Sequence, residues 1–439
     1  METDKTTLND LAIFNAQEED FSVFSFLDCT QTVNGREQLR RNMATPLNGM
    51  EAIVAIQNTI RIIDEKKEQW PKQVSNGTIM VIERFYGTAI DALPKQVTQL
   101  DTFTYKLFHS PDYSLVKYSG IHCFDFIKGM KQLLGLFTIG ECPAPLQKLL
   151  LQAEKLLDIE NLKIVERYEK AADMPVPQQL QFAQFARFQY KNKMLELLDI
   201  YSQFDAWWGM ATAMKKFKLV FPTFIESHEP FFEVEGLYHL LLQAPVPYDI
   251  RLNRKGNFLF LTGANMAGKS TFIKSVGIAV FLAHAGMGVP AKAMQLSVFD
   301  GLLSNINVVD NIAKGESYFF NEVQRIKATV NKVNDGKKWL ILIDELFKGT
   351  NVQDAMKCSL AVIEGLLKIK NSLFILSTHL YEIGEQLKIY PNIHFNYFET
   401  TVEDGQLSFS YQLKDGISND RLGYLILKRE GVVKMLEDL

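Results

Sequence analysis

The segment FLFLTGANMAGKST, residues 258–271, decides the fold class of the second half of the chain. It joins an apolar run, Phe258–Leu261, to a long apolar stretch, Lys269–Ala285, which we predict as a strand and a helix. The loop between them fits G-x-x-x-x-G-K-[ST] at Gly263, Gly268, Lys269 and Ser270. A strand, such a loop and a helix together predict a phosphate-binding P-loop. The alternative, a chance glycine-rich turn, is disfavoured by these flanking elements.

The loop contains the residue types that phosphate binding requires. Glycines let backbone N–H groups wrap phosphate oxygens, and a helix N-terminus adds a positive dipole. We expect Lys269 to reach the β- and γ-phosphates and the Ser270 hydroxyl to bind Mg²⁺. The residues predicted to bind ATP in this loop are Gly263, Ala264, Asn265, Met266, Ala267, Gly268, Lys269, Ser270 and Thr271.

A second apolar run, WLILIDE at residues 339–345, ends in two acids. We predict a strand over Trp339–Ile343, with Asp344 holding Mg²⁺ through water and Glu345 polarising the attacking water. An apolar run ending in two acids is a weak signal alone, and it becomes strong after a P-loop. The adjacent acid favours hydrolysis over a kinase or a passive nucleotide binder.

A third apolar run, Leu373–Ser377, is followed by Thr378 and His379. Polar residues at the carboxyl end of a parallel strand face the ligand crevice of an α/β sheet. We therefore predict that His379 senses the γ-phosphate, although a lone histidine at a strand end is often structural. The candidate catalytic residues are Lys269, Glu345 and His379.

The two halves of the chain differ in their patterns. Residues 1–220 are predicted to be helical, with apolar residues at helical spacing in Leu146–Lys170 and Gln178–Met214. The aromatic stripe of the second segment predicts packing surface rather than a cofactor site. After residue 221, strands alternate with helices, and helices are also expected at Phe319–Val333 and Ala355–Lys368. We predict a helical domain at 1–220 and an α/β domain with a mainly parallel sheet at 221–439, joined through Val220–Ile250.

Composition excludes several classes of protein. The 439 residues carry 47 basic and 51 acidic side chains, a net charge of −4, so any nucleic-acid contact must be local. Four cysteines without C-x-x-C spacing disfavour a disulfide or zinc framework and suit a reducing cytosol. The first residues lack the pattern of a signal peptide, and Ser275–Ala291 falls short of a membrane span. We expect a cytoplasmic protein without membrane partners.

These motifs together resemble those of the MutS family of DNA mismatch-repair ATPases, within the ABC-type superfamily. The resemblance extends from about residue 10 to about residue 435 and is most specific over 220–420. The segments nearest the phosphate site are GANMAGKST (263–271, similar to TGPNMGGKST), DELFKGT (344–350, similar to DEIGRGT), STH (377–379, similar to ATH) and GESYFFNEV (315–323, similar to GRSTFMVEM). The more distant segments are 24–47, which resembles the start of the family's core/lever domain, 222–242, which is similar to the segment leading into its ATPase domain, and YQLKDGIS at 411–418, which resembles its closing strand.

The resemblance implies a homodimer whose ATPase domains share composite sites, with ATP and Mg²⁺ as ligands. Ser317 would contact the γ-phosphate of the ATP bound to the partner subunit. The alternative role of Ser317 is to cap the N-terminus of the helix that follows it. Asn307 and Asp310 fall in the loop that couples ATP to DNA binding in the family. Asp354 matches an acid that acts across the dimer interface. DNA and other repair proteins are the partners that the resemblance implies.

The sequence also departs from the family pattern. Ala264 and Ala267 replace a proline and a glycine, and Glu316 and Tyr318 replace an arginine and a threonine. The phosphate ligands remain, so we expect the pocket to survive, and these changes bear instead on coupling to the partner subunit. Residues 1–220 leave no room for the family's mismatch-reading and connector domains, and its clamp is expected to be absent or reduced. We therefore do not transfer mismatch recognition to this chain.

The sequence leads to one functional hypothesis and two rivals. The hypothesis is an ATP-hydrolysing MutS-like DNA-binding protein that acts in repair or recombination without reading mismatches. The first rival is an ATP-gated protein scaffold that does not bind DNA directly; the second, a P-loop kinase, is disfavoured by Glu345. The candidate DNA contacts, which could equally be solvated faces, are Arg36, Arg40, Arg41, Lys215, Lys216 and Lys218. The pattern does not single out an adenine-stacking residue.

Overall fold

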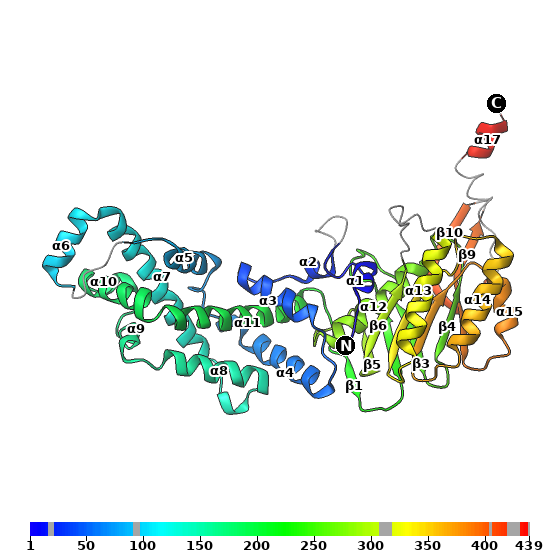
Figure 1. Ribbon diagram of the computed structural model, residues 1–439, viewed down its shortest axis with the longest axis horizontal. Helices are drawn as coiled ribbons and strands as arrows, with labels where there is room; N and C mark the ends of the chain where they lie inside the picture. Colours follow the sequence, from blue (N-terminus) through cyan, green and yellow to red (C-terminus); the bar gives the residue numbers. More distant parts are fainter. Residues whose placement is uncertain (16–21, 91–96, 307–317, 404–405, 419–430, 438–439) are drawn as a thin grey trace. The chain divides into compact units, whose positions relative to one another are not determined.

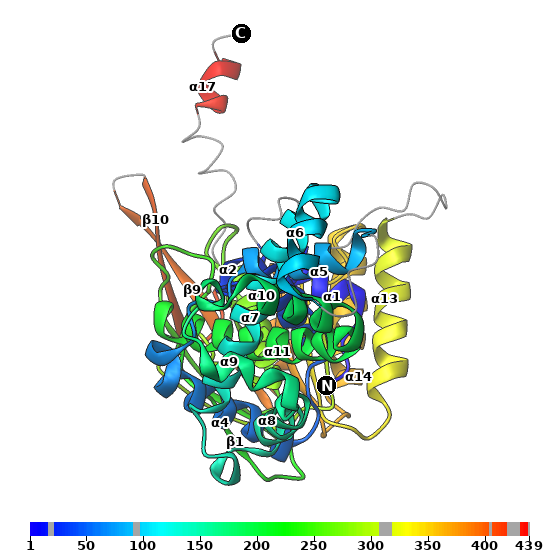
Figure 2. The same cartoon turned by 90° about the vertical axis from the view of Figure 1, so that its left-hand side faces the viewer.

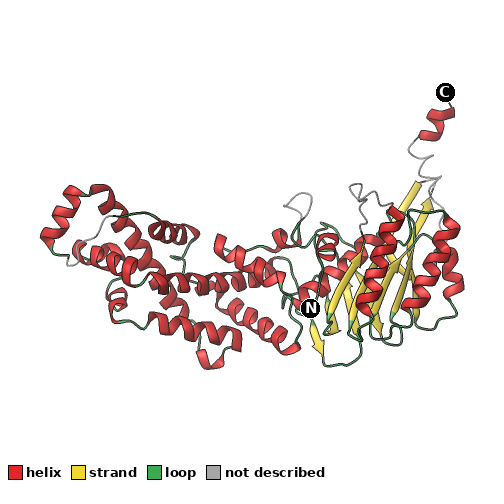
Figure 3. Cartoon of the chain, viewed as in Figure 1, coloured by secondary structure: helices red, strands yellow, loops and turns green. Residues whose placement is uncertain are grey.

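The computed structural model describes residues 1–15, 22–90, 97–306, 318–403, 406–418 and 431–437 (Figure 1). The chain forms two compact units. The sheet unit comprises Met1–Phe26, Thr45–Ile53 and Lys216–Leu439, and the helical unit comprises Leu27–Ala44 and Val54–Lys215. All strands of the described residues, yellow in Figure 3, belong to the sheet unit. The fold is thus helical plus mixed sheets, and the expected single division at residue 220 stays a prediction.

The helical unit is built around two long helices, α7 (Ser110–Leu134) and α11 (Lys191–Lys216). Helix α7 packs against α5, α8 and α10. The other helices are α3 (Val33–Ala44), α4 (Met50–Lys66), α5 (Asn76–Gly87), α6 (Gln99–Phe108), α8 (Ala144–Leu157), α9 (Ile164–Arg167) and α10 (Val176–Gln184). Short 3₁₀ turns lie at Lys67–Gln69, Ile139–Glu141, Glu160–Leu162 and Ala171–Asp173.

The segment predicted as one helical pattern from Gln178 is interrupted. Helix α10 ends at Gln184, a π-helix covers Phe185–Gln189, and α11 begins at Lys191. A π-turn inserts an extra residue per turn and rotates the following side chains. The predicted aromatic stripe is therefore split, because Phe182 and Tyr190 are buried whereas Phe188 is 56% exposed.

One buried carboxylate links two segments of the helical unit that are distant in sequence. Asp205 on α11 is fully buried and accepts hydrogen bonds from the Gln31 and Thr32 amides, both at 2.9 Å, and from the Thr32 hydroxyl at 2.6 Å. A Cβ atom at Gly35 would lie 2.0 Å from Asp205 Oδ2, so only glycine allows α3 to approach this closely. Asp205 therefore fixes the start of α3 against α11.

We expect Asp205→Ala to lower the free energy of unfolding of the helical unit by about 3 kcal/mol, because three donors, two of them on buried Thr32, lose their acceptor. Urea unfolding of the full chain measures the change. Asp199→Ala, which removes an exposed carboxylate from the same helix, is the matched control. Equal unfolding free energies for the two variants would contradict a structural role for Asp205.

The larger sheet of the sheet unit has six strands in the order β10-β9-β4-β8-β7-β6. Neighbours from β9 to β6 are parallel, and β10 pairs with β9 in the antiparallel sense. The strands are β4 (Phe258–Thr262), β6 (Gly301–Asn305), β7 (Trp339–Asp344), β8 (Leu373–Ser377), β9 (Ile393–Glu403) and β10 (Gln406–Asp415). Three of these, β4, β7 and β8, are the apolar runs identified in the sequence.

A second sheet of four strands, in the order β1-β5-β2-β3, takes β1, β2 and the start of β3 from the segment predicted to be a junction. Its strands are β1 (Thr223–Ile225), β2 (Phe231–Leu237), β3 (Tyr248–Asn253) and β5 (Ala293–Ser297). The parallel pair β1–β5 and the antiparallel pairs β2–β3 and β2–β5 make this sheet mixed. The expected linker is therefore part of the folded unit.

Helices cover both faces of the six-stranded sheet. Helix α12 (Lys269–His284) packs on β6, β7 and β8, and Gly277 of α12 lies against Leu342. The opposite face, which carries Phe260 and Ile343, joins a core with α13 (Tyr318–Val333), α14 (Val352–Leu366) and α15 (Tyr381–Leu387). In Figure 2, α13 and the β9–β10 hairpin lie at opposite sides of this unit. The remaining helices are α1 (Lys5–Asp10), α2 (Val23–Leu27) and α17 (Val432–Glu437).

The first residues of the chain pack in the sheet unit. Glu2 pairs with Gly301 beside β6, and the Glu2 carbonyl accepts from Leu302 N at 2.9 Å. Asp10 of α1 accepts from Ser304 Oγ at 2.7 Å and from Ile306 N at 3.0 Å. This segment therefore covers the β6 edge of the sheet, which parallel strands alone would leave unpaired.

Among the described helices, none combines the length and the apolar character needed to cross a membrane.

Candidate functional site

The site begins at the loop between β4 and α12, residues 263–271. Gly263, Met266 and Gly268 have φ values of 139°, 67° and 109°. A side chain at Gly263 would be strained at this φ and would place its Cβ 3.2 Å from the Phe398 carbonyl oxygen. The two glycines therefore allow the loop to turn sharply and leave β4, and α12 begins directly after Gly268.

Lys269 is the first residue of α12 and is only 5% exposed. Its ammonium donates to the Gly263 and Ala264 carbonyls at 2.8 and 2.9 Å, and lies 3.5 Å from His379 Nε2. Burial lowers the pKa of Lys269 to about 8, although the charges of Glu345 and Asp344 act in the opposite direction. A cation is thus held against the loop and beside the end of β8.

Asp344 ends β7 and is almost fully buried. The Ser270 hydroxyl donates to one of its carboxylate oxygens and the Ser377 hydroxyl to the other. Hydroxyl and carboxylate oxygens are ligands that suit Mg²⁺, which takes one or two protein oxygens together with phosphate and water. Ser270 and Asp344, the predicted metal residues, therefore lie together. Ser377 was not predicted as part of the site.

Glu345 follows Asp344 and has a left-handed φ of 61°. Its Oε1 lies 2.7 Å from His379 Nε2 and its Oε2 lies 3.1 Å from Lys348 Nζ. Burial alone would raise the pKa of Glu345, but the hydrogen bond from His379 and the charges of His379 and Lys348 outweigh it and lower that pKa to about 2. The carboxylate is therefore ionised at neutral pH.

These side chains border a pocket of about 460 Å³. Its lining includes Asn265, Met266, Gly268, Lys269, Ser270, Thr271 and Glu345 from the predicted site, together with Leu242, Ala244, Val246, Tyr248 and Tyr411. Six of the nine predicted loop residues and the candidate base thus face one space, whereas Gly263, Ala264 and Ala267 do not line it. His379 contacts both Lys269 and Glu345 at its border.

The sequence reasoning missed Tyr248 and Tyr411. Tyr411 is 41% exposed, has a φ of 54°, and lies at an irregularity in the pairing of β10 with β9. Tyr248 is mostly buried and makes edge contacts with Phe272 and Phe398. Tyr411 begins the segment YQLKDGIS, residues 411–418, so an aromatic residue was visible in the sequence. Only the pairing of β10 with β9 brings its side chain close to Gly268 of the loop.

Other predicted residues are not brought to this pocket. Asp354 lies in the first turn of α14, where its backbone N–H donates to the Asn351 side chain at 3.0 Å. This contact is a helix cap, and an action across a dimer interface stays a prediction. Ser317, Asn307 and Asp310 lie outside the described residues.

The predicted basic clusters take part in local contacts. Arg36 Nε lies 3.2 Å from Asp28 Oδ2, and Arg41 Nε donates to Gln38 at 3.1 Å. Lys216 lies over the Phe217 ring, 4.9 Å from its centroid. The geometry of these residues does not single out a nucleic-acid surface.

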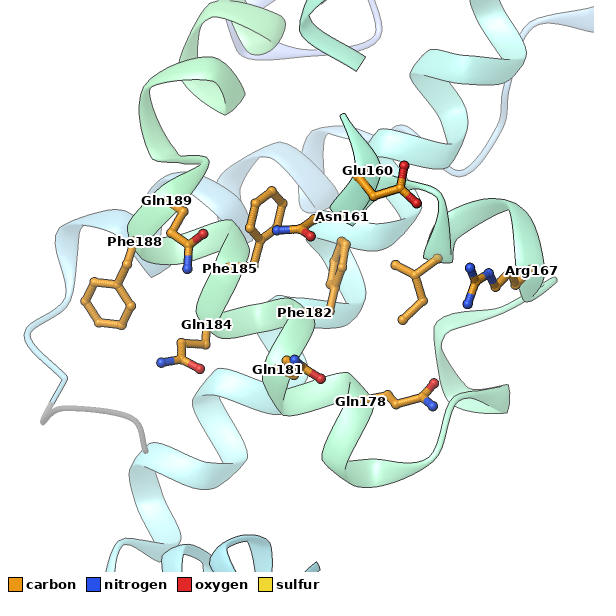
Figure 4. Close-up of a pocket in the computed structure, with 11 residues that line it drawn as sticks. Glu160, Asn161, Arg167, Gln178, Gln181, Phe182, Gln184, Phe185, Phe188 and Gln189 are labelled. Carbon is orange, nitrogen blue, oxygen red and sulfur yellow. The ribbon is translucent and has the colours of Figure 1, made fainter. Parts of the chain in front are cut away.

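A second pocket, of about 690 Å³, lies in the helical unit (Figure 4). Its lining mixes amide and aromatic side chains: Glu160, Asn161, Ile164, Arg167, Gln178, Gln181, Phe182, Gln184, Phe185, Phe188 and Gln189. Its charged residues, Glu160 and Arg167, have opposite charges, so the lining carries little net charge. It contains no residue of the 263–271 loop and is a different type of site.

The comparisons with known proteins cover the segment that contains the 263–271 loop. Residues 259–436 match the family described as MutS domain V. A "DNA mismatch repair protein MutS" of Petrotoga mobilis is 26% identical over 299 residues, which are 67% of this chain and 34% of that protein. One of Pseudothermotoga lettingae is 34% identical over 183 residues, 42% of this chain and 22% of that protein.

A eukaryotic relative gives the same result. The "DNA mismatch repair protein MSH3" of Candida glabrata is 28% identical over 253 residues, 55% of this chain and 24% of that protein. The chain thus spans about a third or less of the length of these curated relatives. Together with the match of residues 259–436 to MutS domain V, these similarities support the assignment of the chain to the MutS family.

Proposed function

We propose that this chain is a MutS-like ATPase, which hydrolyses ATP at the 263–271 loop and acts in DNA repair or recombination without reading mismatches itself. The observation that carries the proposal is one connected set of contacts. Glu345 contacts His379, His379 lies 3.5 Å from Lys269, and the neighbouring Asp344 accepts from Ser270. A base, a cation and a metal-binding pair are thus assembled around one pocket.

In this proposal the 263–271 loop is a P-loop. Its backbone N–H groups and the N-terminus of α12 hold the phosphates of ATP, and the Lys269 ammonium exchanges its loop carbonyls for phosphate oxygens. Ser270 and Asp344 hold Mg²⁺, which, when bound, neutralises charge that develops on the phosphates. The parallel strands support this assignment, because they bring the ends of β4, β7 and β8 to one edge.

Glu345 is the proposed general base. Its carboxylate accepts a proton from the attacking water, and His379 fixes the carboxylate through Oε1 and lies close enough to read the γ-phosphate. A second acid beside Asp344 favours water over another phosphoryl acceptor. By resemblance, Ser317 completes the partner subunit's site in a homodimer, and other repair proteins are further partners.

Tyr411 is proposed to stack on the adenine. We expect Tyr411→Ala to weaken ATP binding by about tenfold, because stacking of a base on an aromatic ring contributes about 1–3 kcal/mol. Tyr411→Phe keeps the ring and should bind ATP like the wild type. Titration with a fluorescent ATP analogue measures both, and inorganic tripolyphosphate, which lacks a base, should bind equally to all three proteins. Unchanged ATP affinity of Tyr411→Ala would exclude this role.

DNA is the proposed polymer partner. The test is binding of the purified chain to duplex, mismatched, branched and single-stranded DNA, with and without ATP, at about 50 and about 200 mM salt, since phosphate contacts weaken steeply with salt. We expect ATP- and salt-dependent binding that is indifferent to mismatches. Failure to bind any DNA, with ATP hydrolysis intact, would contradict DNA binding.

That last outcome would leave the ATP-gated protein scaffold, which one observation favours. The pocket of the helical unit offers the amides of Gln181, Gln184 and Gln189 beside phenyl rings, with little net charge. Amides pair with peptide backbone, and phenyl rings bury apolar side chains, whereas DNA binding requires an excess of cations. The DNA titration above separates the two functions.

A further inference from the structure

The loop that carries Glu345 has a strained backbone. Between β7 and α14, both Glu345 and Phe347 adopt left-handed φ values, 61° and 60°. Neither residue is a glycine, and such conformations cost about 1–3 kcal/mol each. They persist only where the surrounding structure holds them, so the contacts that hold this loop also set the position of Glu345.

Several of those contacts come from one helix, α13, in addition to the hydrogen bond from the Glu345 N–H to the Ser377 carbonyl of β8 at 3.0 Å. Glu322 accepts a hydrogen bond from the Lys348 N–H at 3.2 Å with Oε1, and one from the Gly349 N–H at 3.4 Å with Oε2. One turn earlier, the Phe319 ring packs against the Phe347 ring, with centroids 5.6 Å apart. Helix α13 therefore contacts the loop through both the Glu322 carboxylate and the Phe319 ring.

Glu322 is an unusual residue in this position. It is only 4% exposed, and burial raises its pKa although the Lys348 and Gly349 amides act in the opposite direction. A buried carboxylate costs free energy unless its acceptors are used, and here they are used by the loop backbone. Glu322 does not line the 460 Å³ pocket, so contact with ATP does not account for it.

The loop also places Lys348 beside Glu345, the proposed general base. Lys348 Nζ lies 3.1 Å from Glu345 Oε2, and the Lys348 backbone is the first of the two groups that Glu322 holds. A shift of this backbone would move both the base and its cationic neighbour. Reaction geometry is sensitive to such shifts, since a misplacement of about 1 Å can lower a rate by about a hundredfold.

We propose that Glu322 is a positioning residue, which couples α13 to the general base by holding the strained loop that carries Glu345 and Lys348. The inference rests on the proposed ATP hydrolysis and adds to it a residue outside the nucleotide pocket. It makes the position of α13 a determinant of the hydrolysis rate rather than of ATP affinity.

The test measures ATP affinity, kcat and thermal stability for Glu322→Gln and Glu322→Ala in the full chain. We expect kcat to fall at least about tenfold, with ATP affinity within about threefold of the wild type. Glu364→Gln is the matched control, because it removes the charge of a partly buried glutamate on α14 that accepts from the Tyr390 hydroxyl, away from the loop. It should leave kcat unchanged.

A second arm separates positioning from general destabilisation. In a Glu345→Gln background, Glu322→Ala should lower the residual rate no further, because residues that act as a unit are not additive. A full additive loss there, or a folded Glu322→Gln with wild-type kcat, would overturn the inference. If the wild type itself does not hydrolyse ATP, the proposed function fails instead.

Discussion

Lys269→Ala is expected to weaken ATP binding by at least about a hundredfold and to abolish hydrolysis, since charge-assisted hydrogen bonds contribute about 1.5–3 kcal/mol each. Lys269 is the buried cation at the start of α12, held over the carbonyls of Gly263 and Ala264. Alanine removes the charge and leaves those carbonyls to face the phosphates. Isothermal titration with ATP and Mg²⁺ measures the affinity, and phosphate release measures the rate.

The control for this variant is Lys274→Ala, which removes a half-exposed lysine from the same helix outside the pocket. It should bind ATP like the wild type. The lysine also predicts a pH dependence. Phosphate favours the charged form, and the pKa of Lys269 in the free protein is about 8. ATP affinity should therefore decline as the pH rises through this value, and Lys269→Ala should lose that part of the dependence. Equal ATP affinity in Lys269→Ala and Lys274→Ala would contradict the assignment.

Glu345→Gln is expected to lower kcat by about 10²–10⁴-fold while ATP binding is retained, because a carboxamide cannot accept the proton of the attacking water. The glutamine keeps the size of the side chain and an acceptor for His379. Rapid-mixing measurements of phosphate release give kcat, and a fluorescent ATP analogue gives the affinity. The variant should also accumulate the ATP-bound form, which makes it useful for trapping the proposed dimer.

Glu385→Gln provides a closely matched comparison. Glu385 pairs with Lys388 three residues later, as Glu345 pairs with Lys348, but on α15 and outside the pocket. Glu385→Gln should hydrolyse ATP at the wild-type rate. A Glu345→Gln protein with wild-type kcat would show that another group activates water.

The sequence predicted the centre of the sheet unit closely, because its strands are buried on both faces and read as continuous apolar runs. The predicted strands Phe258–Leu261 and Leu373–Ser377 correspond to β4 and β8, and the helix after the loop ends one residue from the predicted end. The resemblance to the MutS family that the same motifs suggested is confirmed by the comparisons. Local patterns were sufficient to predict an element wherever its hydrophobic pattern and its flanking residues lay in one continuous segment.

What the sequence did not predict depends on contacts between distant segments. Strand β9 was not identified, and the resemblance implied a strand at 411–418 without its pairing, so Tyr411 could not be placed beside the 263–271 loop. The role of Glu322 is equally hidden, because a lone acid on an amphipathic helix is indistinguishable from a solvated one until its depth is known. The packing of the first residues on β6 likewise required the folded structure, since α1 is only six residues long.

The central claim is that the chain hydrolyses ATP at the pocket between the 263–271 loop and Glu345. The most direct measurement is steady-state phosphate release from ATP by the purified full chain, with Mg²⁺ and with a chelator, in the wild type and in Glu345→Gln. The account predicts saturable, Mg²⁺-dependent release in the wild type that is lost in the variant. Equal release by both proteins, or ATP binding by the wild type without any release, would contradict it.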